Sequence, residues 1–166
     1  MKKKLLLFVL PILLLVGCTM SNTPTSKVEE LFTKYQKLDT DIDSGISSIL
    51  DEQNISEAQK ERYRKVLENQ YKNLTYQIKD EEIDGNKATV IVSIEVLDLK
   101  RAINDLVFDS SIYTKETYDE EKLNRLEKAK DKVQYTLELT VTKDDDGEWK
   151  LDALTNEDIK KIQGMY

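Results

Sequence analysis

The sequence predicts an α+β fold, in which N-terminal helices pack in a curved four-stranded antiparallel sheet. Two observations support this prediction. Apolar residues recur at helical spacing from residue 24 to residue 74, and they then alternate with polar residues over 74–97 and again over 133–153. A turn signal divides each alternating stretch into a hairpin, and a helical insertion at 99–132 separates the two hairpins.

Three helices are expected before the first strand. The first is predicted over about 24–38, a short second one over 42–50, and a third after Ser56, which has the spacing of a capping box with Gln59. The apolar positions that define these helices are Val28, Leu31, Phe32, Tyr35 and Leu38, then Ile42, Ile46, Ile49 and Leu50, then Tyr63, Val66, Leu67, Tyr71 and Leu74.

Two hairpins are expected to supply the strands. The first turns at 84–86, beyond an acidic stretch at 80–84 that we expect to be solvated. Its second strand has a half-apolar face, which we expect to be partly covered, and an apolar face of Ala88, Val90, Val92, Ile94 and Val96. The second hairpin turns at 143–148, where Trp149 is expected to pack on the core. Its apolar positions are Val133, Tyr135, Leu137, Leu139 and Val141, then Trp149, Leu151 and Ala153.

The insertion and the C-terminal segment return to helical spacing. The pattern predicts helical structure over 99–107 and a charged surface helix opened by a capping box of Thr117 and Glu120. Asn156 is expected to cap a last short helix that ends near Gly164. There is no internal repeat and no second boundary in the pattern, so residues 27–166 are predicted to form a single domain.

The first 17 residues are predicted to be a lipoprotein signal peptide. Three lysines at 2–4 precede 13 uncharged residues, a run too short for a membrane-spanning helix, which needs about 20. The run ends in Leu-Val-Gly-Cys, which resembles the bacterial lipobox. This resemblance implies cleavage between Gly17 and Cys18, a diacylglyceryl group on the Cys18 thiol, and acylation of the new amine. The alternatives are an uncleaved anchor helix and an ordinary secretory signal with an unrelated cysteine.

A lipidated Cys18 has consequences for location and partners. Residues 18–26 are predicted to be a lipidated tether, and the protein is expected on the outer face of the cytoplasmic membrane, with a Gram-positive source favoured. Removal of three lysines leaves 22 basic and 32 acidic residues, a formal charge of −10. Because phosphate contacts need lysine and arginine, we expect the membrane as a partner through the lipid and no nucleic acid.

Three stretches of the sequence resemble a known family. They are the opening helix KVEELFTKYQKLD, the strand KATVIVSIEV and the ending VQYTLELTVTKDDDGEWKLDAL, which contains Gly-x-Trp-x-Leu. Together they are similar to small envelope lipoproteins of the cystatin-like cone fold, which the nuclear-transport-factor-two-like superfamily shares. The resemblance implies a sheet wrapped around helices, with a cavity at the mouth of the cone. The insertion at 99–132 departs from the compact family pattern.

Residue types exclude several chemistries. The chain has no histidine and one cysteine, which is assigned to lipid, so triad and Cys-His catalysis and histidine-ligated zinc are not expected. No cofactor is expected. The weak metal candidate is the D-x-D-x-D spacing of Asp39, Asp41 and Asp43, but a calcium loop needs Gly and Glu where Ser44 and Leu50 stand. The alternative is an interhelix turn whose aspartates cap the second helix.

The leading hypothesis is a non-catalytic, lipid-anchored binding or accessory module for an envelope protein or envelope component. Five tyrosines fall on inward faces, and most of them are expected to be core residues whose hydroxyls reach the rim. These are Tyr35, Tyr63, Tyr71, Tyr76 and Tyr135. The inward stripes contain no obvious lone carboxylate, so no enzyme is predicted. The alternative is a carrier of small molecules, or a histidine-independent enzyme, that uses the cone cavity. A signalling or stress-linked accessory role is a third interpretation.

Overall fold

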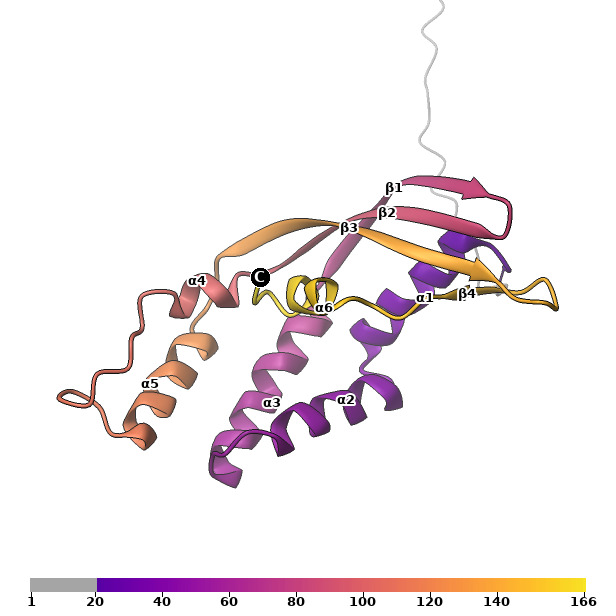
Figure 1. Cartoon of the computed structure of the whole chain (residues 1–166). Coiled ribbons are helices and arrows are strands. Elements are labelled where there is room, and N and C mark those ends of the chain that lie inside the picture. The colour runs from indigo at the N-terminus through magenta and orange to yellow at the C-terminus, as the bar shows by residue number, and fades with distance from the viewer. Residues whose placement is uncertain (1–20) are drawn as a thin grey trace, which may run out of the picture.

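A computed structural model describes residues 21–166, and it confirms the predicted α+β fold class. The four strands form one antiparallel sheet in the order β1-β2-β3-β4. The elements are α1 (Pro24–Lys37), α2 (Thr40–Asp51), α3 (Glu57–Lys72), β1 (Thr75–Asp84), β2 (Lys87–Leu97), α4 (Leu99–Ile103), α5 (Lys115–Glu127), β3 (Lys132–Lys143), β4 (Trp149–Leu151) and α6 (Asn156–Ile162). The helices lie on one side of the sheet (Figure 1).

The main core lies between the sheet and the helices α1, α3 and α6. All five predicted positions of β2 are buried there, from Ala88 to Val96. They pack with Phe32 of α1, Tyr71 of α3 and Ile162 of α6 in one apolar cluster. The period-two pattern of β2 therefore identified the buried face of the sheet correctly. Trp149 belongs to the same cluster, as expected.

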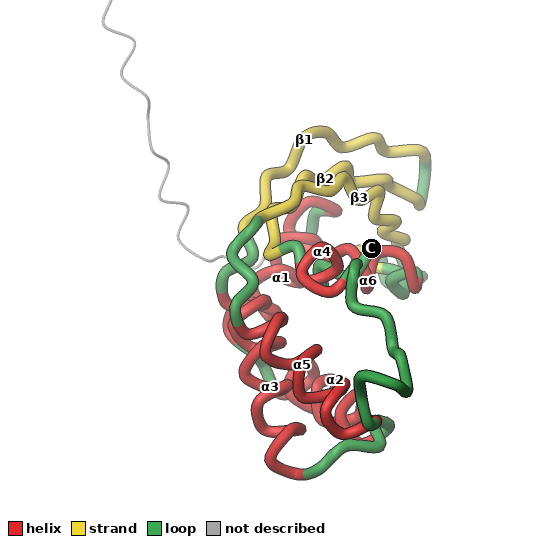
Figure 2. Tube along the Cα trace, turned by 90° about the vertical axis from the view of Figure 1, so that its left-hand side faces the viewer, coloured by secondary structure: helices red, strands yellow, loops and turns green. Residues whose placement is uncertain are grey.

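The opposite face of the sheet carries no helix (Figure 2). We expected the half-apolar outer face of β2 to be partly covered, and the cover comes from the neighbouring strand β3. Ser93 is buried because the Gln134 side chain of β3 lies across it and donates a 2.6 Å hydrogen bond to its hydroxyl. Cross-strand side chains therefore shield this face in place of a separate element.

The predicted helix start is correct for α3, where the cap precedes a clear apolar stripe, and is wrong for α5 and α6. Ser56 and Gln59 form the predicted capping box of α3. α5 begins earlier than expected, since Thr114 is its N-cap and Thr117 is the third helical residue, so the predicted box of Thr117 and Glu120 is wrong. α6 is capped by Thr155 and not by Asn156, which is already helical. In both cases an extended threonine just upstream supplies the capping oxygen.

Two further boundaries differ from the prediction, and one strand contains an unpredicted bulge. The helix predicted over 99–107 ends at Ile103, and the chain continues as a loop that reaches α5. β1 contains a bulge between Ile78 and Asp80, which shifts its register against β2. β4 ends at Leu151, so Ala153 lies outside the sheet and is exposed.

The domain begins before the predicted boundary at residue 27. Asn22 already bonds to the second hairpin, and α1 starts at Pro24, so the last residues of the predicted tether 18–26 belong to the fold. A proline at the first helical position is favourable because its missing N–H would have no partner there. The predicted lipidation and cleavage residues, Gly17 and Cys18, lie outside the described residues. Within residues 21–166, no helix is both long and apolar enough to cross a bilayer.

Candidate functional site

The insertion, residues 98–131, is the part of the chain that departs from a simple sheet-and-helix body. It contains α4, the connecting loop 104–114 and α5, and it projects beyond the end of the sheet (Figure 1). Its own apolar core is small. Leu99, Leu123 and Leu126 are buried with Val66 of α3. Its buried residues are distinct from those of the main core, although Tyr63 of α3 packs against both, and polar contacts with α3 add to the attachment of α5.

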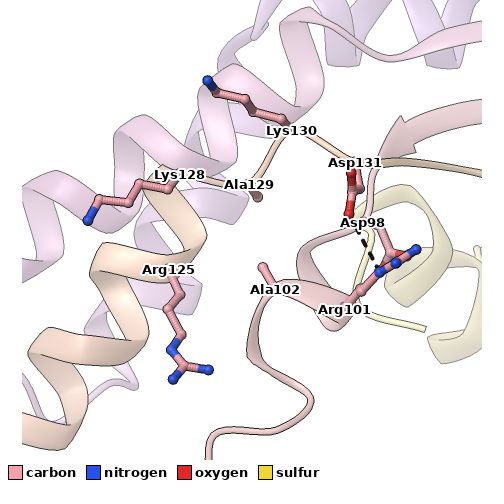
Figure 3. Close-up of a pocket in the computed structure, with 8 residues that line it drawn as sticks. All are labelled: Asp98, Arg101, Ala102, Arg125, Lys128, Ala129, Lys130 and Asp131. Atoms are coloured by element: carbon pink, nitrogen blue, oxygen red, sulfur yellow. Dashed lines mark hydrogen bonds and ion pairs between the residues drawn. The ribbon is translucent and has the colours of Figure 1, made fainter.

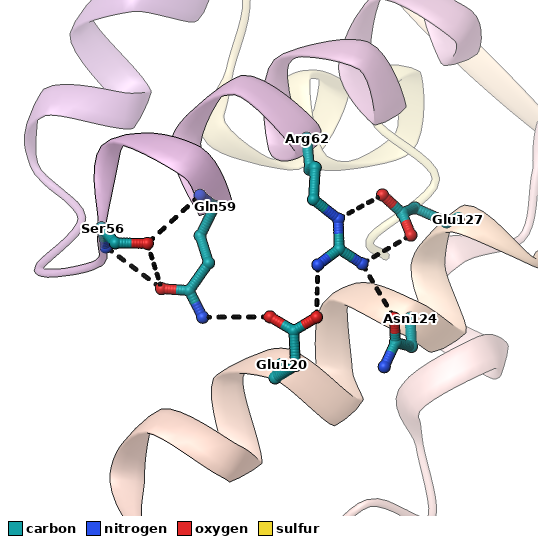
Figure 4. A network of polar contacts seen from close by, with 6 residues as sticks. All are labelled: Ser56, Gln59, Arg62, Glu120, Asn124 and Glu127. Atoms are coloured by element: carbon teal, nitrogen blue, oxygen red, sulfur yellow. Dashed lines mark hydrogen bonds and ion pairs between the residues drawn. The ribbon is translucent and has the colours of Figure 1, made fainter.

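A polar clamp joins α3 to α5. The guanidinium of Arg62 donates to both carboxylate oxygens of Glu127, at 2.8 and 2.7 Å, and to the amide oxygen of Asn124 at 2.8 Å. It also pairs with Glu120, which in turn receives a bond from Gln59 (Figure 4). Arg62 thus uses its planar fork to hold three side chains of one helix. The neighbouring guanidinium holds the pKa of the Glu127 carboxyl below its usual range.

A buried amide holds the end of β2, the point where the insertion begins. Gln70 is fully buried on α3, and its side chain accepts from the Leu97 N–H and donates to the Leu97 carbonyl, both at 3.0 Å. It therefore pairs with the end of β2 as another strand would. Gly164 packs against the same place, since a Cβ there would lie 2.0 Å from the Leu97 oxygen and its φ is +67°. The C-terminal segment consequently fixes the point from which the insertion leaves the sheet.

The loop 104–114 exposes large apolar side chains. Val107 is 73% exposed, Ile112 70% and Phe108 50%. We call these three residues the apolar loop surface. The prediction that Val107 lies on a helix face is therefore wrong, because the chain has already left α4.

Internal bonds and aromatic contacts hold this loop in place. The Tyr118 hydroxyl of α5 donates to the Leu106 carbonyl at 3.2 Å, and the rings of Phe108 and Tyr113 pack edge-on against Tyr118. At the loop tip, the Asp109 carboxylate accepts bonds from the amide and hydroxyl of Ser111. The apolar loop surface is thus attached to a helix and is not an unsupported excursion of the chain.

A cavity of about 430 Å³ lies on the other side of the insertion, between α4 and the end of α5. Four cations line it, which is notable in an acidic protein, but they do not converge on one point (Figure 3). Arg101 pairs with Asp131, and Arg125 pairs with Glu121 and Asp105. Lys128 and Lys130 point away from the cavity. The arrangement is therefore unsuited to coordinating a single small anion.

The predicted calcium residues are not brought together as a metal site. Asp39 is the N-cap of α2 and accepts a 3.1 Å bond from the Ile42 N–H, while Asp41 and Asp43 lie in the first helical turn. Asp43 pairs with Arg64 at 2.8 Å. In the described part of the chain, no three acidic, histidine or cysteine side chains group as metal ligands. The alternative interpretation, an interhelix turn whose aspartates cap the second helix, holds for Asp39 alone, because Asp41 and Asp43 already lie in the helix.

Side chains fill the space between the sheet and its helices. The ring of Phe32 stacks on that of Tyr76 at 4.7 Å, and Tyr35 meets Tyr71 edge-on at 4.9 Å. Burial raises the pKa of the Tyr35 hydroxyl. Among the described residues, the buried side chain that carries a carboxylate is Asp158, and it accepts bonds from Thr155 at the start of α6.

Three structurally important residues were missed by the sequence analysis. Arg62 and Gln70 lie on α3 among charged and polar residues, where the pattern offers no sign that one is clamped and the other buried. Glu81 was expected to be solvated, but the β-bulge turns it toward α1, where it accepts bonds from the Thr25 amide and hydroxyl at 2.8 and 2.7 Å. One feature of the sequence could have indicated the contact of Glu81 with α1. The first turn of α1 has no acidic residue, so its N–H groups have no local anion.

Comparison with family models, curated proteins and solved structures gave no match to this chain. The resemblance to cystatin-like lipoproteins therefore stays a prediction. Three features of the structure bear on function: a filled core, an insertion with its own small core, and an exposed apolar loop surface.

Proposed function

We propose that the protein is a lipid-anchored module of the cell envelope that binds a partner protein without catalysing a reaction. In this proposal Cys18 carries the lipid, the domain sits on the outer face of the cytoplasmic membrane, and the apolar loop surface contacts the partner. The short apolar run before Cys18 and its lipobox-like end support the anchor.

The observation that carries the binding proposal is the exposure of Val107, Phe108 and Ile112 on one loop. Each of these large apolar side chains is at least half exposed, and burying them against another molecule would remove apolar surface from water. Here the loop is also held by Tyr118, so its side chains are arranged before a partner arrives. Such order reduces the conformational entropy that binding would otherwise cost.

The filled interior favours this proposal over a carrier or a histidine-independent enzyme. A cone-fold enzyme without histidine needs a carboxylate in a dry pocket, where burial raises its pKa. The buried carboxylate of Asp158 instead accepts bonds from the amide and hydroxyl of Thr155, the N-cap of α6. The aromatic pairs of Phe32 with Tyr76 and of Tyr35 with Tyr71 lie in the main core between the sheet and the helices.

Membrane fractionation tests the anchor. Cys18→Ser removes the thiol that would be acylated, and we expect the variant to leave the membrane fraction and enter the secreted or soluble fraction. A variant that is cleaved after Gly17 and still stays with the membrane would contradict the anchor proposal.

Photo-crosslinking on intact cells tests the binding surface. A crosslinking amino acid at Val107 should give a discrete adduct, whereas the same group at Glu138, on the helix-free face of the sheet, should not. A Phe108→Asp and Ile112→Asp double variant should abolish the adduct while the circular dichroism spectrum is retained. Equal adducts at Val107 and Glu138, or an adduct that survives the double variant, would reject the binding surface.

A further inference from the structure

The chain enters the fold at a fixed point on the second hairpin. The Asn22 side chain donates to the Gly147 carbonyl at 3.1 Å, and it accepts from the Trp149 N–H at 2.8 Å. This amide therefore pairs with the free edge of β4 in the way a neighbouring strand would. Asn22 is four residues beyond Cys18.

Two further contacts hold the start of α1. Thr23 and Ser26 form a reciprocal capping box at its N-terminus. The carboxylate of Glu81 accepts from the Thr25 amide and hydroxyl, so the first hairpin also grips this helix end. The two hairpin turns are themselves joined, because the Lys143 N–H donates to the Asn86 carbonyl at 2.8 Å. The start of α1 and both hairpin turns thus form one end of the domain, which we call the hairpin end.

The link between the lipid and the hairpin end is short. Four residues of fully extended chain span at most about 14 Å between the α-carbons of Cys18 and Asn22. A domain of this size has a radius of gyration of about 15 Å and a width of about 40 Å. The link is therefore much shorter than the domain, whatever its conformation.

The apolar loop surface lies at the other end of the molecule. The loop between α4 and α5 is at the far side from the start of α1 and the turn between β3 and β4 (Figure 1). A short link at one end keeps that end close to the bilayer. The turns of the hairpin end are themselves acidic, so the short link, and not charge, is what keeps this end at the bilayer.

We infer that the domain stands on the membrane with its hairpin end against the lipid headgroups and presents loop 104–114 away from the bilayer. This inference rests on the proposed lipid anchor and names the surface that each partner meets. The bilayer faces the turns at 84–86 and 144–148, and the protein partner meets the apolar loop surface from the outer side. The partner site is therefore expected to face the extracellular space and not the lipid.

Energy transfer to labelled headgroups tests the orientation. Acylation blocks the Cys18 sulfur, so an introduced cysteine is the free thiol of the lipidated full-length protein. Asp145→Cys and Ser110→Cys place one donor dye at the hairpin end or in the loop. The protein is reconstituted into vesicles of phosphatidylcholine and phosphatidylglycerol that carry an acceptor on the headgroup. With a domain width of about 40 Å, we expect transfer at least about twofold greater from position 145 than from position 110.

Equal transfer from the two positions would mean that the domain lies flat, and stronger transfer from 110 would mean that it is inverted. Either result overturns the inference. A Gly/Ser insertion of about 12 residues after Met20 adds roughly 20 Å of flexible chain. We expect it to reduce the difference between the two positions, and an unchanged difference would overturn the role of the short link. Vesicle flotation and the mass of the Cys18 peptide are measured in parallel, because loss of lipid there rejects the anchor and not the orientation.

Discussion

The sheet-and-helix body and the insertion are held together by different means. In the body, 18 buried residues form one apolar cluster that joins β2, β3 and β4 to α1, α2, α3 and α6, and the partly buried Tyr76 and Ile78 of β1 pack against it. In the insertion, three buried leucines share a small core with Val66, and much of the remaining attachment is polar, through Arg62. The body therefore relies mainly on apolar burial, while the insertion relies on a few leucines and an ionic clamp.

This contrast indicates which part of the molecule can open while the rest stays folded. Regions with few buried apolar contacts open locally at a lower free energy than the core. The insertion combines such a weak attachment with the apolar loop surface. The part of the molecule proposed to bind a partner is therefore also the part expected to open first.

The largest expected effect is in the body. Phe32→Ala removes a fully buried ring that stacks on Tyr76, and we expect a loss of about 3–5 kcal/mol in the free energy of unfolding. Urea unfolding followed by far-ultraviolet circular dichroism and by Trp149 fluorescence should show both signals shifting together. The matched control is Phe108→Ala in the exposed loop, which should change stability by no more than about 0.5 kcal/mol. Comparable losses for the two variants would contradict the assignment of the core.

A change in the small core should act locally. Leu123→Ala deletes a buried side chain of α5, and we expect a loss of about 2–3 kcal/mol, at the low end for buried leucines because few residues surround it. Hydrogen exchange should show reduced protection in α5 and retained protection in β2 and β3. If protection falls equally in the strands, the insertion is not an independent unit and the contrast drawn here is wrong.

The junction between the two regions is tested at Gly164. Gly164→Ala combines a left-handed backbone, which costs roughly 1–2 kcal/mol, with a Cβ that would lie 2.0 Å from the Leu97 oxygen. We therefore expect a total loss of about 2 kcal/mol or slightly more, measured by thermal unfolding. Gly85→Ala is the control, because Gly85 also has a positive φ but has no atom within 4 Å of the new Cβ. Equal losses would show that the contact with Leu97 contributes nothing.

The smallest expected effect is the response of the clamp to acid. The pKa of Glu127 is lowered in the folded protein by Arg62, so its contribution is present above the ordinary glutamate pKa, about 4.3, and is lost as pH falls through the lowered value. Hydrogen exchange of α5, corrected for its intrinsic pH dependence, should therefore show weaker protection as the pH falls below about 4.

Arg62→Met provides the control for this pH response. Without the guanidinium, the pKa of Glu127 should return toward its ordinary value, and the additional acid sensitivity of α5 should disappear. The variant should also lose about 1 kcal/mol of attachment at neutral pH, since the clamp is partly exposed. An identical pH response in the variant would exclude the clamp as its cause.

The periodicity of the sequence is sufficient to place most helices and strands and to identify their buried faces. The alternation from Ala88 to Val96 identified the inner face of β2, and the stripe through Val28, Phe32 and Tyr35 identified the inner face of α1. Ser56 with Gln59 marked the start of α3. These features are local, because helical and extended periodicity, capping oxygens and turn residues act over a few positions of the chain.

How distant segments are joined cannot be read from the sequence and is seen only in the folded structure. Four polar side chains bond to groups that lie far away in the sequence. Arg62 bonds to α5 and Gln70 to β2, while Glu81 bonds to α1 and Asn22 to β4. A polar residue in a polar stretch looks the same whether it is solvated or bonded to a backbone group 27 or 127 residues away. Its role is fixed when packing brings an unpaired donor or acceptor within reach, since a buried polar group without a partner is costly.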